Sequence, residues 1–267
     1  MIKKQILEYF DIQQKQFELN FEPAFTTTDE KSIHDIRVCI KRLRLLYRFL
    51  DFFSDEQFCS KKKAKLLADV FKSAGPLRDA QIRIAIFEKM KGDLKSNYTD
   101  LNEFLKLQER SEIRKFKQKA NTFNAEQIRD LFNFSEALLK IIIHFPGLQI
   151  AFDSYKENRR NKIRSLLKRD KPKVEFHQVR KRLKDLTYLT EIQQLPSDET
   201  NEELLNLKLL GKRLGDWHDL EVFLDELNYL KSEKKKPEVD FEEIEAKLKQ
   251  QQQVIIDEFY KEYANLR

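Results

Sequence analysis

Residues 32–49 read SIHDIRVCIKRLRLLYRF, a stretch that decides the fold because it combines two helical patterns. On a helical wheel with about 100° per residue, Ile36, Ile40 and Leu43 share one face. Basic side chains, headed by His34, share the opposite face. The stretch therefore predicts a helix whose apolar face joins a core and whose basic face serves another purpose.

The composition favours long helices throughout the chain. Among 267 residues only 5 are Gly and 6 are Pro, whereas good helix formers such as Leu, Lys, Glu, Gln and Arg are abundant. We therefore predict an all-α fold. The expected helices span residues 2–20, 29–52, 55–74, 76–91, 97–121, 125–145, 148–169, 173–194, 198–214, 216–235 and 238–265.

The basic stretch has a counterpart in the second half of the chain. IHDIRVCIKRLRLLY at residues 33–47 and FHQVRKRLKDLTYLT at residues 176–190 share an apolar residue followed by His, an Arg three residues after the His and a Lys seven residues after it. Further along, AGPLRDAQI at residues 74–82 aligns with LGDWHDLEV at residues 214–222. Two matches in the same order, at offsets of 143 and 140 residues, indicate an internal duplication.

The duplication predicts a single domain made of two repeats, at about residues 1–123 and 124–267. We expect the repeats to form two helical bundles related by a pseudo-twofold axis. In that arrangement the basic faces of the two repeats line one basic central groove.

The groove predicted in this way carries two rows of side chains. The first basic row consists of His34, Arg37, Lys41, Arg44 and Arg48, and the second consists of His177, Arg180, Lys181, Lys184 and Tyr188. Arg makes bidentate contacts with phosphate oxygens and Lys acts as a point charge, so a mixed row suits a phosphate-bearing ligand. The length of the rows favours a polymer, and a bound polyanion favours protonated His, so we expect tighter binding at mildly acidic pH.

A different interpretation is that these are solvated surface charges paired with neighbouring Asp and Glu. Two features favour anion binding instead. The first basic row contains no acidic residue within its arc, and the same arrangement recurs at the repeat offset.

The two rows resemble the conserved histidine α-helical domain (CHAD) family. The family's first-repeat pattern, His-x-x-Arg-x-x-x-Lys/Arg-Arg-x-Arg, is similar to His34, Arg37, Lys41, Arg42 and Arg44. Its second-repeat pattern, His-x-x-Arg-Lys-x-x-Lys-x-x-Arg-Tyr, resembles the second basic row. The resemblance implies two four-helix bundles with a basic central cavity that binds inorganic polyphosphate without known catalysis.

The second repeat departs from the family pattern at three positions. Thr187 stands where an Arg is expected, and Asp185 stands where the first repeat has Arg42. The Arg-Asp pair of the following turn is similar to residues 78–79, but His218 replaces the Arg in the second copy. We therefore expect the second basic row to bind more weakly than the first.

The predicted site combines the two rows with the family pattern. The expected polyphosphate-binding residues are His34, Arg37, Lys41, Arg42, Arg44, Arg48, His177, Arg180, Lys181, Lys184 and Tyr188, and further candidates are Arg78, His218, Lys72 and Lys212. Asp79 and Asp219 each follow a Gly-containing break, where we expect an Asp to cap the next helix and orient a basic side chain.

Nothing in the sequence predicts a catalytic residue, a metal site or a cofactor, so we expect a binding protein and not an enzyme. Cys39 and Cys59 lack ligand-like spacing. His218-Asp219 has the HD form of metal-dependent phosphohydrolases without their further ligands. EIEAK at residues 243–247 has the ExExK form of CYTH-type triphosphatases, which requires a strand, whereas its surroundings are helical in pattern.

The charge of the chain permits an anionic partner. Lys and Arg number 51 against 45 Asp and Glu, a formal net charge of +6. Nucleic acid is the alternative to polyphosphate, although the aromatic residues lie mainly at core spacing and not among the basic ones as base stacking requires. A scaffold without an anionic ligand is the third possibility.

The start of the chain predicts where the protein is found. It lacks the apolar core of a signal peptide, and no apolar run reaches the roughly 18 residues of a membrane span. We expect a cytoplasmic protein with no membrane partner, and polyphosphate granules are one location within that compartment. The oligomeric state is left open.

Overall fold

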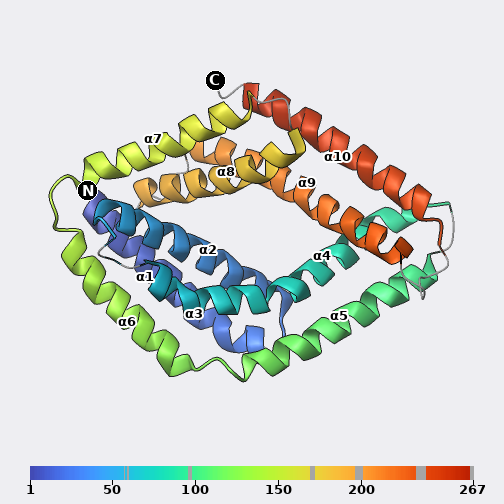
Figure 1. Cartoon of the computed structure of the whole chain (residues 1–267), viewed down its shortest axis with the longest axis horizontal. Helices are drawn as coiled ribbons and strands as arrows, with labels where there is room; N and C mark the ends of the chain where they lie inside the picture. Colours follow the sequence, from blue (N-terminus) through green and yellow to red (C-terminus); the bar gives the residue numbers. More distant parts are fainter. Residues whose placement is uncertain are drawn as a thin grey trace. The chain divides into compact units, whose positions relative to one another are not determined.

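The computed structural model describes residues 1–56, 58, 60–95, 98–168, 172–195, 201–232 and 239–264, with side chains for all of these except 60–64 and 172–174. Cys59 lies outside the described residues. The described part of the chain is helical, with one 3-10 turn, η1 (Lys91–Asp93), and no strand, so the all-α prediction is confirmed (Figure 1). The α-helices are α1 (Ile2–Thr26), α2 (Glu30–Phe53), α3 (Ser60–Ser73), α4 (Gly75–Met90), α5 (Thr99–Ala120), α6 (Ala125–Ile142), α7 (Leu148–Leu166), α8 (Pro172–Gln194), α9 (Glu202–Ser232) and α10 (Phe241–Ala264).

The chain divides into two compact units. The first unit contains residues 1–74 and 117–208, and the second unit contains residues 75–116 and 209–267. Each unit takes residues from both predicted repeats. The duplication itself and the basic groove stay predictions.

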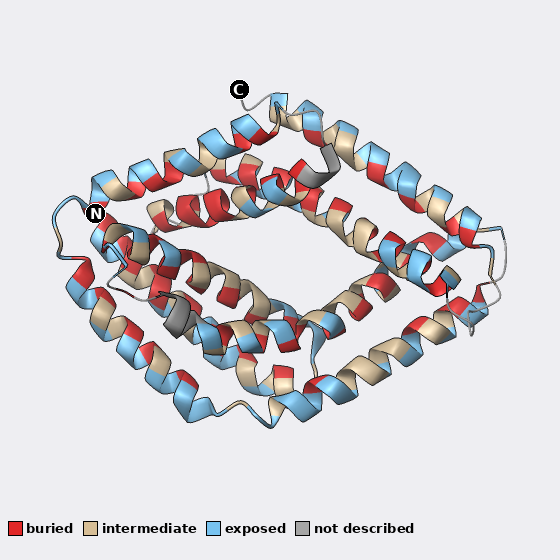
Figure 2. Ribbon diagram, viewed as in Figure 1, coloured by how far each residue is buried: buried red, intermediate tan, exposed pale blue. Residues whose placement is uncertain are grey.

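The core of the first unit is built on α1, α2, α7 and α8. α1 packs against α2, α6 and α8. α2 packs in addition against α3, α7 and α8, and α7 packs against α8. The predicted apolar face of α2 is confirmed, because Ile36, Ile40 and Leu43 are buried. Figure 2 shows that buried residues alternate with exposed and intermediate ones along the helices. Edge-to-face aromatic contacts add to this core, with ring centroids of Phe17 and Phe132 5.4 Å apart.

The second unit has its own core, which α4, α5, α9 and α10 share. Buried residues from these helices, among them Phe87, Leu105, Phe223 and Leu248, form one hydrophobic cluster. Polar contacts join three of the helices, because Arg83 of α4 lies 3.5 Å from Gln108 of α5 and 3.9 Å from Glu226 of α9. Gln108 of α5 donates to Glu226 of α9 at 2.6 Å. The second unit therefore has the buried surface of a helical bundle in its own right.

The helix break predicted at Gly215 is wrong, because α9 continues through this residue without interruption. In the matching stretch of the first half, α3 and α4 are separate helices. The difference is Pro76, which cannot donate the backbone N–H that a continuous helix needs, whereas the aligned residue in α9 is Asp216. A glycine alone costs about 1 kcal/mol in a helix interior, too little to interrupt a helix that packs into a core.

Replacing Gly215 with Ala should stabilise the protein. A Cβ at this position meets nothing within 4 Å, and Gly inside a helix is less stable than Ala by about 0.5–1 kcal/mol. We expect G215A to raise the free energy of unfolding by about this amount, measured by urea denaturation.

Gly147 supplies the matched control for that variant. A Cβ there also meets nothing within 4 Å, but its φ of 82° lies in the left-handed region. G147A should therefore lower the free energy of unfolding by about 1–2 kcal/mol. Destabilisation of the same size in both variants would contradict a continuous α9 at Gly215.

Candidate functional site

α2 carries the first basic row, and a side-chain cap fixes where this helix begins. The Asp29 carboxylate accepts a hydrogen bond from the backbone N–H of Ser32 at 2.7 Å, which satisfies a free donor of the first turn. This hydrogen bond lowers the pKa of the Asp29 carboxyl. The cap sets the phase of α2, in which Ile36 is buried and His34 is exposed.

The members of the two basic rows lie at different depths. His34, Arg48 and Lys181 are exposed and Tyr188 is buried. The half-buried members are Arg37, Lys41, Arg44, His177, Arg180 and Lys184.

Two ion pairs join α2 to α8 within the first unit. Arg42 Nη2 lies 3.1 Å from the Glu191 carboxylate, and Arg48 Nη2 lies 2.8 Å from the Asp185 carboxylate. Because residue numbers rise along α2 as they fall along α8, the two helices are antiparallel at this contact. At the 143-residue offset of the repeats, Arg42 is aligned with Asp185 and Arg48 is aligned with Glu191. Each arginine is therefore aligned with the carboxylate that pairs with the other arginine. A pseudo-twofold axis between α2 and α8 would produce this exchange.

Arg42 and Tyr188 both contribute to the helix contact itself. The Arg42 guanidinium lies 5.4 Å from the Tyr188 ring centroid, and its Nη1 lies 3.5 Å from Gln13 Oε1 on α1. Burial raises the pKa of Tyr188 to about 12, and nearby Arg42 opposes this shift. Phosphate contacts of these two residues stay predictions, but both side chains are already engaged among α1, α2 and α8.

Phe71 on α3, which no sequence pattern predicts, contacts two arginines of the first basic row. Arg37 Nη1 donates to the Phe71 carbonyl at 2.8 Å, and the guanidinium lies 4.2 Å from the Phe71 ring centroid. Arg44 approaches the same ring at 5.8 Å. The Phe71 carbonyl is among the last four of α3, so Arg37 also lies at the negative end of this helix. Only the packing of α3 on α2 makes Phe71 a neighbour of both arginines.

Part of the positive charge of the first unit is not neutralised. Within the described part of the chain, Arg44, Lys72 and Lys181 form no ion pair with a carboxylate. Partial burial lowers the pKa of Arg44, and the neighbouring charge of Arg48 lowers it further. A cation held beside another cation favours an anionic ligand.

The remaining candidates lie on α4 and α9 in the second unit; they are Arg78, Asp79, Lys212, His218 and Asp219. The predicted capping role of the two aspartates is wrong, because Asp79 lies a turn inside α4 and Asp219 lies in the interior of α9. Asp219 cannot cap a helix because α9 is continuous around it, and the interior of a helix offers no free backbone N–H donors of a first turn. Their role in orienting basic side chains stays a prediction.

The structure also bears on the other motifs. EIEAK at residues 243–247 lies in α10, so its helical interpretation is confirmed and its alternate residues do not share a face as they would on a strand. Over the residues with described positions, no group of three or more His, Cys, Asp or Glu side chains could hold a metal ion. Nor does any helix in this part of the chain have the length and apolar character needed to cross a membrane.

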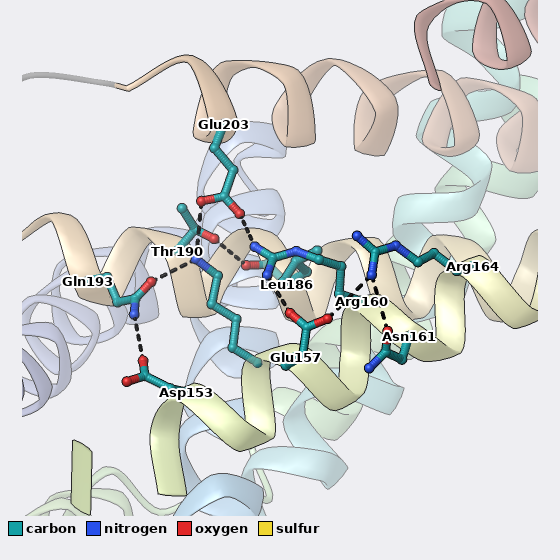
Figure 3. A network of polar contacts seen from close by, with 10 residues as sticks. Asp153, Glu157, Arg160, Asn161, Arg164, Leu186, Thr190, Gln193 and Glu203 are labelled. Carbon is teal, nitrogen blue, oxygen red and sulfur yellow. Dashed lines mark hydrogen bonds and ion pairs between the residues drawn. The ribbon is translucent and has the colours of Figure 1, made fainter. Parts of the chain in front are cut away.

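A polar network fixes α8 between its neighbours in the first unit (Figure 3). Lys156 of α7 donates to Gln193 of α8 at 2.7 Å and to Glu203 of α9 at 3.2 Å. Arg160 of α7 also donates to Glu203. Lys156 is largely buried, and this desolvation lowers its pKa although Glu203 opposes the shift. The network holds the first turn of α9 against α7 and α8, and α8 carries the second basic row.

The chain belongs to the CHAD domain family, whose pattern matches residues 8–228. The crystal structure of the CHAD domain from the plant Ricinus communis is similar, with a TM-score of 0.66 and 16% identity over 96% of this chain and 86% of that chain. PptA from Streptomyces chartreusis is similar with a TM-score of 0.65 and 13% identity over 98% of this chain and 99% of that chain. These likenesses show the fold. A search of curated proteins by sequence gave no match.

Replacing Glu203 with Gln should weaken the first unit, because Lys156 would keep its buried charge with less compensation. We expect a loss of about 1–3 kcal/mol in the free energy of unfolding at pH 7, below the range of a fully buried pair because Glu203 is partly exposed. The exposed pair Glu136–Lys140 is the control, and E136Q should change stability by less than about 0.5 kcal/mol.

The E203Q variant also tests how the stability of the protein depends on pH. The pKa of Glu203 is lowered on folding, because the charges and hydrogen bonds of Lys156 and Arg160 outweigh the opposing effect of burial. A lowered carboxyl pKa stabilises the folded state above the usual pKa of 4.5 and loses that effect as pH falls through the folded value. The stability difference between wild type and E203Q should therefore shrink below pH 4.5. A difference that is independent of pH would contradict this account.

Proposed function

We propose that the protein binds inorganic polyphosphate, without catalysis, through the basic residues that the first unit carries on α2 and α8. The observation that supports this most strongly is Arg44. Its guanidinium lies near the Phe71 ring and beside Arg48, its pKa is lowered, and it has no ion-pair partner in the described part of the chain. A phosphate group would supply the missing negative charge.

The arrangement of the cations favours a chain of phosphates over a single one. Arg37 and Arg44 flank Phe71 two helical turns apart, about 10 Å along the axis at 1.5 Å per residue. Lys72 follows Phe71 directly in the sequence and also has no ion-pair partner among the described residues. Cations spread over two helices match a ligand with repeated charges, whose binding releases counterions.

The family resemblance and the charge pattern point to the same ligand class. The CHAD pattern implies polyphosphate, and the uncompensated charge of the first unit is compatible with it. We propose no reaction, no cofactor and no metal. We further propose that the protein binds polyphosphate in the cytoplasm, where polyphosphate granules would be its partner structure.

Arg44 and Lys181 test the proposal from one helix each, because neither forms an ion pair with a carboxylate in the described part of the chain. Changing both to Gln removes two charges, and we expect affinity for polyphosphate of defined length to fall at least tenfold in isothermal titration at physiological salt. The control is K15Q with K140Q, which removes two charges that are paired with acidic residues one turn away. Equal losses in both double variants would contradict a site on α2 and α8.

Nucleic acid is the second candidate ligand, because a basic helix face also fits a phosphodiester backbone. Phe71 is the aromatic side chain placed among the cations of the first basic row, and two guanidinium groups already flank it. We therefore expect single-stranded RNA or DNA with the same number of phosphates to bind more weakly than polyphosphate. Binding of RNA or DNA that equals or exceeds that of polyphosphate at physiological salt would overturn the polyphosphate proposal.

A further inference from the structure

Asp185 of α8 is surrounded by three guanidinium groups from three helices. Arg48 of α2 lies 2.8 Å away, Arg159 Nε of α7 lies 3.6 Å away and Arg182 of α8 lies 3.8 Å away. One carboxylate thus faces three positive charges. This cluster has a net positive charge of two, which a single buried Asp cannot neutralise.

The three arginines differ in their freedom to move. The Arg159 guanidinium lies 3.9 Å from the Tyr155 ring centroid and its side chain is 11% exposed, so packing holds it in place. Arg48 is 44% exposed and Arg182 is 35% exposed. Two of the three guanidinium groups can therefore reach a ligand in solvent while the third stays beside Asp185.

The other ion pair of the α2–α8 contact has a different balance of charge. Glu191 faces Arg42 at 3.1 Å and Lys208 at 3.9 Å, and Arg42 is also in contact with Tyr188 and Gln13. The excess of guanidinium groups is found only at the Asp185 end of this contact, among the residues with described side chains. Arg48 is also the last member of the first basic row, so this cluster lies where that row ends.

We propose that Arg48, Arg159 and Arg182 form an anion subsite at the end of the first basic row, and that Asp185 occupies it until a phosphate group competes for Arg48 and Arg182. This inference rests on the proposed function. The ligand class is a phosphate group of a linear polyphosphate, which offers each guanidinium two oxygens. Asp185 is a positioning residue that acts through the arginines, and it lowers affinity because it competes with the ligand.

Titration of the full chain with tripolyphosphate at low salt tests the role of Asp185. D185N keeps the shape of the side chain and removes its charge, so we expect affinity to rise roughly tenfold and its salt dependence to become steeper. E136Q is the charge-matched control, since Glu136 lies on α6 and pairs with Lys140. It should change affinity by less than about twofold, because the partly exposed Glu136 pairs with Lys140 and with none of the three arginines of the cluster.

A second variant keeps the inference testable if D185N does not fold. R182Q changes a partly exposed side chain, and we expect it to weaken tripolyphosphate binding at least threefold without changing the thermal unfolding midpoint. Unchanged or weaker binding by folded D185N would overturn the subsite, and so would unchanged binding by R182Q. In either case, binding of tripolyphosphate by the wild type would leave the proposed function standing. Failure of wild type to bind tripolyphosphate and long-chain polyphosphate would overturn both.

Discussion

The antiparallel contact between α2 and α8 is the constraint on which the arrangement of the two basic rows depends. Its two ion pairs take guanidinium groups from one helix and carboxylates from the other. Partly buried pairs of this kind add little net stability, because desolvation offsets much of the Coulomb attraction. Their more specific effect is on register, since a shift of α8 along α2 would place Arg42 and Arg48 away from Glu191 and Asp185.

The same contact decides which cations are available to a ligand. In the first half of the chain the contact positions are Arg42 and Arg48, and at the 143-residue offset they are Asp185 and Glu191. The acidic second copy therefore neutralises part of the basic first copy. What is left in the first unit, at Arg44, Lys72 and Lys181 and in the excess of guanidinium groups around Asp185, is the charge that we assign to binding. This division of roles gives a physical reason to expect weaker binding by the second basic row, which stays a prediction.

Much of the fold could be predicted from the sequence because it depends on local periodicity. The apolar face of α2 follows from the spacing of Ile36, Ile40 and Leu43, and the helical state of residues 243–247 follows from their surroundings. The predicted break at Gly215 is wrong because a glycine alone does not interrupt a packed helix, whereas Pro76 lacks the N–H of a continuous helix. The predicted capping role of Asp219 depends on that break and is wrong for the same physical reason.

The candidate site was less predictable because its partners come from tertiary packing. Helical spacing places Arg37 and Arg44 on one face, but nothing local indicates that Phe71 lies between them. In the same way, Arg159 and Asp185 are 26 residues apart and meet only because α7 packs on α8. A pattern of cations shows where charge accumulates, and only the fold shows which of that charge is already neutralised.

The salt dependence of polyphosphate binding tests the central claim most directly. The chain is titrated with polyphosphate of one defined length over a series of salt concentrations. If unneutralised cations bind the phosphates, the logarithm of the association constant should fall linearly with the logarithm of salt concentration, with a slope of about −2 to −4 for three to five contacts. Affinity that does not change with salt, or no binding at low salt, would contradict the account.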